Sequence, residues 1–83
     1  MTMFDFQLLT QGEQINILYN EGTYIGKRKH DGLIALLYQV DSFYVEVVYR
    51  KYRCFIASIK CSESTMILDP YLEQIDVEYL AGY

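Results

Sequence analysis

The sequence predicts an α+β domain, in which a four-stranded antiparallel meander sheet is flanked by an N-terminal and a C-terminal helix in the order α-β-β-β-β-α. Residues 23–61 are rich in β-branched and aromatic side chains and contain three short turn signals, whereas apolar residues recur at helical spacing on either side. Links this short make neighbouring strands antiparallel. A chain of 83 residues has room for one core, so we expect residues 1–83 to form a single domain.

The first helix is expected at about Gln11–Glu21. Thr10 and Glu13 have the spacing of a capping box, in which each side chain bonds the backbone amide of the other residue. One apolar stripe follows at helical spacing, and it consists of Ile15, Leu18 and Tyr19. Gly22 can end the helix, because glycine is the common residue directly after a helical C-cap.

Four strands of ordinary length fit between the turn signals. The turns are predicted at His30–Gly32, Asp41–Ser42 and Lys51–Arg53. The predicted strands are therefore Thr23–Lys29, Leu33–Val40, Phe43–Arg50 and Cys54–Cys61.

The second helix is expected to begin between Met66 and Asp69, with Thr65 or Asp69 as its cap. Pro70 is the only proline, and it is tolerated in the first turn of a helix. The apolar positions at helical spacing are Ile67, Leu68, Tyr71, Leu72 and Ile75. Helices at both ends of a meander normally share one face of the sheet, and we expect that arrangement here.

The turns set which side chains share a face of the sheet. A two-residue turn at Asp41–Ser42 pairs Val40 with Phe43 and gathers an apolar core face. At residues 51–53, a two-residue link would turn Ser58 and Lys60 inward. We favour a three-residue link, which places on the core face Phe55, Ala57, Ile59 and Cys61.

The opposite face is too apolar to be left to water alone. It is expected to carry Leu33, Ala35, Leu37, Gln39, Tyr44, Glu46, Val48, Cys54, Ile56, Ser58 and Lys60. A contiguous apolar patch of this kind more often marks an interface, so we expect the chain to bind a second copy or another protein. The interface candidates are Leu33, Leu37, Tyr44, Val48 and Ile56. The sequence leaves one alternative open, in which one helix covers each face and nothing remains exposed.

Basic residues flank the first and third turns, which lie at the same end of a meander. Six of the seven Lys and Arg residues are found there. Basic and aromatic side chains together can hold phosphates and stack on bases, so this end is a candidate site for nucleic acid or a phosphorylated ligand. The candidates are Lys27, Arg28, Lys29, Arg50, Lys51, Tyr52 and Arg53. The net charge of −4 opposes polyanions, and we therefore do not expect nucleic acid to be the partner.

The sequence contains no recognisable catalytic or metal-binding constellation. His30 is the only histidine, and the glycines do not form a phosphate-binding loop. Cys54 and Cys61 should alternate to opposite faces and remain free thiols, as is typical of a reducing compartment. The longest apolar run, Leu33–Tyr38, is too short to span a bilayer, and no export signal precedes it. We expect a cytoplasmic protein that is not an enzyme and binds no cofactor.

Three segments, which are spread over most of the chain, resemble a group of short uncharacterised bacterial proteins. They are residues 21–26 (EGTYIG), 37–49 (LYQVDSFYVEVVY) and 68–76 (LDPYLEQID). The resemblance implies a bacterial cytoplasmic protein and carries over no activity and no site. The apolar face opposite the predicted core indicates a protein-interaction or regulatory module that acts as a homodimer. Binding of nucleic acid or a phosphorylated ligand is the alternative, and an enzyme whose site is completed across a dimer is a third.

Overall fold

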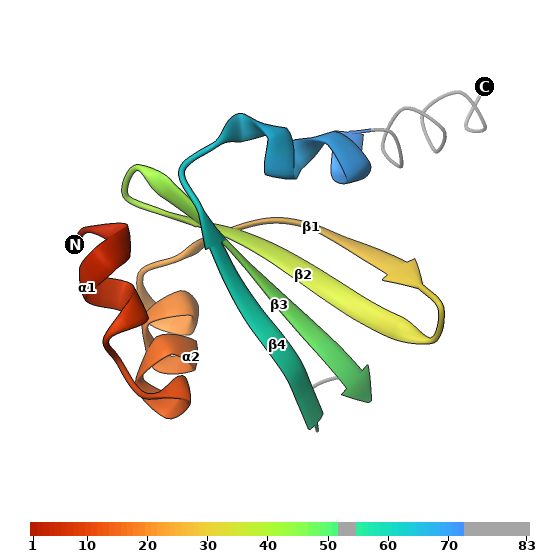
Figure 1. Ribbon diagram of the computed structural model, residues 1–83, viewed down its shortest axis with the longest axis horizontal. Helices are drawn as coiled ribbons and strands as arrows, with labels where there is room; N and C mark the ends of the chain where they lie inside the picture. The colour runs from red at the N-terminus through yellow and green to blue at the C-terminus, as the bar shows by residue number, and fades with distance from the viewer. Residues whose placement is uncertain (52–54, 73–83) are drawn as a thin grey trace.

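The computed structural model describes residues 1–51 and 55–72, and it confirms the predicted α+β meander (Figure 1). The four strands are arranged in the order β1-β2-β3-β4, and every neighbouring pair is antiparallel. The elements are α1 (Met3–Gln7), α2 (Gln11–Asn20), β1 (Thr23–His30), β2 (Leu33–Val40), β3 (Phe43–Lys51), β4 (Phe55–Ser62) and the 3-10 turn η1 (Thr65–Leu68).

Two capped helices precede the sheet. The predicted capping box begins α2, since Thr10 Oγ1 accepts from the Glu13 amide at 3.2 Å and Glu13 Oε1 accepts from the Thr10 amide at 3.0 Å. A Cβ at Gly22 would stand 2.7 Å from the Leu18 carbonyl oxygen, so the chain leaves α2 where only glycine fits. The short helix α1 was not expected from the sequence. Thr2 caps it by accepting a hydrogen bond from the Asp5 amide at 3.1 Å.

The helices α1 and α2 pack on one face of the sheet, which we call the first face (Figure 1). Phe6 and Leu18 are almost completely buried there, and the Phe6 ring lies 5.6 Å from the ring of Phe43. The strands contribute Leu36, Tyr38, Val40, Phe43, Val45, Val47 and Tyr49. The predicted pairing of Val40 with Phe43 is confirmed, as is the apolar core face that it sets.

The C-terminal segment, residues 63–72, lies on the opposite face, which we call the second face (Figure 1). The side chain of Tyr71 packs on Ala35 and Leu37. The expectation that both predicted helices share one face is therefore wrong. The alternative is correct in placing one helix on each face, but it also expected nothing to remain exposed, and an open hollow lies on the second face. Phe6 and Leu18 already fill the first face, so the apolar residues after β4 can be buried only on the second.

The start of that segment differs in detail from the prediction. Its first turn is the 3-10 turn η1, and residues 69–72 continue as α-helix. The N-cap is Ser64 rather than Thr65 or Asp69, because Ser64 Oγ accepts a hydrogen bond from the Met66 amide at 3.2 Å. The predicted helical position Ile75 lies outside the described residues.

Two irregularities in the pairing of β3 with β4 change which side chains of β4 lie on the first face. Val48 pairs with Ser58 and Tyr49 with Ile56, so Ala57 is an extra residue on β4. A bulge of this kind reverses the alternation of side chains. Ile59 and Cys61 lie on the first face, as predicted. Ile56 also packs there, so the prediction that Ile56 lies on the second face was wrong.

Other residues of β4 are affected in the same way. Ala57 and Phe55 were expected on the core face, but Ala57 lines a hollow on the second face and Phe55 is 64% exposed. Cys61 is a half-buried free thiol, and burial raises its pKa. Cys54 lies outside the described residues.

Candidate functional site

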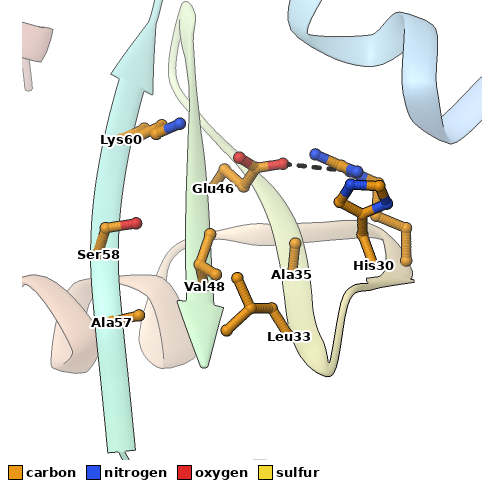
Figure 2. Close-up of a pocket in the computed structure, with 9 residues that line it drawn as sticks. His30, Leu33, Ala35, Glu46, Val48, Ala57, Ser58 and Lys60 are labelled. Carbon is orange, nitrogen blue, oxygen red and sulfur yellow. Dashed lines mark ion pairs between the residues drawn. The ribbon is translucent and has the colours of Figure 1, made fainter. Parts of the chain in front are cut away.

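The second face is only partly covered by the C-terminal segment, and an open hollow of about 210 Å³ lies on it. All four strands contribute to its lining, which consists of Arg28, His30, Leu33, Ala35, Glu46, Val48, Ala57, Ser58 and Lys60. Figure 2 shows Leu33, Ala35 and Val48 in its centre, with Ser58 and Lys60 on the β4 side and His30 on the opposite side. The hollow therefore combines an apolar floor with charged walls.

Strand register explains why these side chains meet. Arg28 pairs with Ala35, and Ala35 pairs with Val48, which in turn pairs with Ser58. Residues that pair directly in antiparallel strands project to the same side of the sheet. One row across all four strands therefore forms the base of the hollow. The neighbouring row brings Glu46 and Lys60 to the same face.

A buried carboxylate forms the polar wall of this site. Glu46 is only 6% exposed, and its Oε2 atom accepts a hydrogen bond of 2.6 Å from the Tyr71 hydroxyl. The Nε atom of Arg28 is 3.7 Å from the same oxygen. A carboxylate is costly to bury unless it is paired and hydrogen-bonded. Tyr71 and Arg28 together supply those partners.

The environment of Tyr71 favours its neutral form. Burial raises the pKa of the phenol well above its usual range, and the hydrogen bond to Glu46 and the charge of that carboxylate raise it further. The Arg28 guanidinium acts in the opposite direction, and its carbon lies 5.6 Å from the centre of the Tyr71 ring. Tyr71 is therefore a hydrogen-bond donor at neutral pH.

Arg28 is not fully satisfied in this arrangement. Its Nε atom is buried and has no hydrogen-bond partner in the described part of the chain, although it forms the long ion pair with Glu46. Buried donors without an acceptor are rare and cost free energy. This atom is the unmet polar group at the boundary between the hollow and the C-terminal segment.

The residues predicted for an interface are divided by the fold. Leu37 is completely buried beneath the C-terminal segment, and Tyr44 is half-buried in the same cluster. Ile56 lies on the first face. Leu33 and Val48 remain accessible in part, because they line the hollow.

The predicted basic residues are also divided. The turn between β1 and β2 lies at the same end of the sheet as the last residues of β3 and the first residues of β4. Arg28 turns into the hollow, whereas Lys27 and Lys29 pair with residues whose side chains lie on the first face. Arg50 lines a separate shallow depression beside Phe55. The side chain of Lys51 and all of Tyr52 and Arg53 lie outside the described residues.

The association of Glu46, Tyr71 and Arg28 was not found from the sequence. One signal was present, because Glu46 is a lone charge in the middle of an apolar strand, where it requires a buried partner. That partner could not be chosen from the pattern, since Tyr71 is 25 residues away and Arg28 lies two strands away in the sheet.

Comparisons with protein-family models, curated proteins and solved structures found no match for this chain. Within residues 1–51 and 55–72, no cluster of three or more His, Cys, Asp and Glu side chains could hold a metal ion. Over the same residues, no helix has the length and apolar character needed to cross a membrane.

Proposed function

We propose that the protein is a small non-enzymatic interaction module that acts as a homodimer, and that two copies pair along their β4 edges. The observation that supports this most strongly is the difference between the two outer strands of the sheet. An unpaired edge strand presents rows of backbone N–H and C=O groups, and proteins that remain monomeric usually protect such edges with charges, bulges or covering segments.

The β1 edge carries such protection. Lys27, Arg28 and Lys29 follow one another in this strand, and the register shifts between Tyr24 and Gly26. Lysine side chains and a bulge both oppose the addition of another strand. The β1 edge is therefore poorly suited to pairing with a second copy.

The β4 edge has much less protection. Its irregular part ends at Ala57, and the following residues Ser58–Ser62 pair regularly with β3 and include one charge, Lys60. Among the described residues, no strand lies on the outer side of β4. This segment can therefore accept the same segment of a second copy in antiparallel pairing.

The position of Lys60 indicates the register of this pairing. Like charges directly opposite each other destabilise an antiparallel pair. A register that pairs Ile59 with Ile59 of the second copy avoids this, because Lys60 then lies opposite Ser58 of the second copy. The two sheets would join into one, with both hollows on the same side. The added burial matters for a chain of this size, whose own core is small.

A binding role also agrees with the chemistry of the hollow. Its buried carboxylate, on Glu46, is already held by Tyr71 and Arg28. The alternative of a phosphate or nucleic-acid site gains no support from the described side chains, since Arg28 is paired with Glu46 and Lys27 and Lys29 lie on the other side of β1.

A charge-reversal pair of variants tests the proposed dimer. In the proposed register, Ser58→Glu places a carboxylate opposite Lys60 of the second copy, while Ser58→Lys places a second ammonium there. Cross-strand charge pairs contribute roughly 0.2–1 kcal/mol each, and the symmetric dimer contains two. We expect the dimer dissociation constant, measured by light scattering or sedimentation over a concentration series, to differ between these variants by about fivefold or more.

The matched control changes the other edge. Lys29→Glu on β1 should leave the dissociation constant unchanged, because this edge does not pair. The proposal is wrong if the protein is a monomer at every concentration. It is also wrong if Ser58→Glu and Ser58→Lys dimerise equally well.

A further inference from the structure

The side chain of Tyr71 is buried in a pocket on the second face. Its side chain is 2% exposed, although Met66 is 73% exposed and Leu72 is 50% exposed in the same segment. Ile67 and Leu68 are only partly buried. The segment is therefore anchored to the sheet through one aromatic residue.

The pocket around Tyr71 is built mainly by the sheet, and Ile67 and Leu68 of the segment also pack against it. Ala35 and Leu37 form its base, and Ile25, Tyr44 and Val48 pack around them. Gly26 lies beside the ring, and a Cβ there would be in ordinary van der Waals contact with Tyr71 Cδ2, at 3.5 Å. Glu46 accepts a hydrogen bond from the hydroxyl, and Arg28 lies over the ring. These residues belong to β1, β2 and β3, so the sheet supplies this part of the pocket without the segment.

The structure also contains a group that can replace the Tyr71 hydroxyl. Arg28 Nε lacks a hydrogen-bond partner and is 3.7 Å from the oxygen of Glu46 that Tyr71 occupies. A shift of about 1 Å would bring Nε to the usual length of a charge-assisted hydrogen bond. Glu46 therefore keeps a partner after the phenol leaves, which lowers the cost of opening the pocket.

We propose that this pocket is a binding site for a tyrosine side chain of a partner protein, and that Tyr71 is its built-in competitor. A partner segment that displaces residues 63–72 would place its ring over Leu37 and donate its hydroxyl to Glu46. The buried carboxylate selects tyrosine over phenylalanine, because a carboxylate accepts more than one hydrogen bond and only tyrosine donates one in addition to that of Arg28. This inference does not depend on pairing along β4.

The side chain of tyrosine is available as a free probe, 4-methylphenol. The wild-type protein and Tyr71→Phe should be titrated with it while the backbone amide signals of Ala35, Leu37 and Glu46 are followed by NMR. The variant keeps the internal ring but loses its hydroxyl, so the internal competitor is weaker. We expect 4-methylphenol to bind Tyr71→Phe about tenfold more tightly in apparent affinity than it binds the wild type.

Two controls make the result specific. Tyr19→Phe, an exposed position on α2, should bind 4-methylphenol as the wild type does. The methyl ether 4-methylanisole cannot donate a hydrogen bond, and it should bind Tyr71→Phe about tenfold less tightly than 4-methylphenol does. Equal affinities of the two compounds would contradict recognition by Glu46.

The proposal is overturned if 4-methylphenol binds the wild type and Tyr71→Phe equally, or if it does not shift the three pocket amides. Tyr71→Ala provides a second measurement, because it vacates the pocket. If this variant folds, 4-methylphenol should raise its melting temperature toward that of the wild type, and an unchanged melting temperature would also overturn the proposal. If it does not fold, the Tyr71→Phe titration decides.

Discussion

The two faces of the sheet are buried in different ways. On the first face, Phe6 and Leu18 of two helices interlock with a continuous set of apolar strand residues. On the second face, one aromatic residue, Tyr71, covers part of the sheet, and a buried carboxylate and an open hollow lie beside it. The first face therefore contributes most of the buried apolar core, while the second face is where we propose that a partner binds.

The largest expected effect belongs to the first face. Phe6→Ala removes a fully buried ring that packs against Phe43, and we expect it to lower the free energy of unfolding by about 3–5 kcal/mol. Phe4 lies two positions away in the same helix and is 69% exposed. Phe4→Ala should therefore change stability by less than about 0.5 kcal/mol. Urea unfolding of both variants measures this, and similar losses would show that α1 does not seal the first face.

A smaller loss is expected on the second face. Tyr71→Phe keeps the buried ring but removes the hydrogen bond to Glu46, which should cost about 1–3 kcal/mol. The same unfolding experiment tests this value. A loss as large as that of Phe6→Ala would contradict the view that the second face contributes less to stability.

Alkaline pH is expected to weaken the contribution of Tyr71 on the second face to the stability of the fold. The pKa of Tyr71 is raised above its ordinary value of 10.0, so its contribution to stability is complete below pH 10.0 and is lost as the pH rises through the higher folded pKa. Ionised Tyr71 would place a second negative charge beside Glu46. Above about pH 10, we expect the wild type to lose its stability advantage over Tyr71→Phe. An advantage that stays constant at high pH would argue against the buried pair.

The smallest expected effect concerns the cap of α2. Hydrogen bonds from the amide and hydroxyl of Thr10 lower the pKa of the Glu13 carboxyl below its ordinary value of 4.5. Its stabilising effect is therefore present above pH 4.5 and is lost as the pH falls through the lowered pKa. Thr10→Ala should return the pKa of Glu13 toward 4.5 in an NMR titration. An unchanged pKa would mean that the capping box does not persist in solution.

The sequence predicted most of the fold because its signals are local. The capping box at Thr10, the turn at Asp41–Ser42 and the alternation in β2 and β3 each depend on a few neighbouring residues. The bulge at Ala57 could not be foreseen, because pairing of β3 with β4 decides it, and it moved Ile56 to the first face.

The site was harder to predict than the fold. Arg28 was identified as a basic residue at one end of the sheet, but its ion pair with Glu46 depends on packing across three strands. Tyr71 was predicted as an apolar helical position, and it is buried on the second face because α1 and α2 already cover the first. Local pattern carries no information about such long-range partners.

Amide hydrogen exchange of the two edge strands tests the proposed β4 dimer most directly. It should be measured at a low and a high protein concentration and followed residue by residue in β1 and in Ser58–Ser62. Pairing of two β4 edges predicts that the outward amides of Ser58–Ser62 exchange more slowly at the high concentration, while those of β1 do not change. Exchange in Ser58–Ser62 that is independent of concentration, or slowing in β1 instead, would contradict the account.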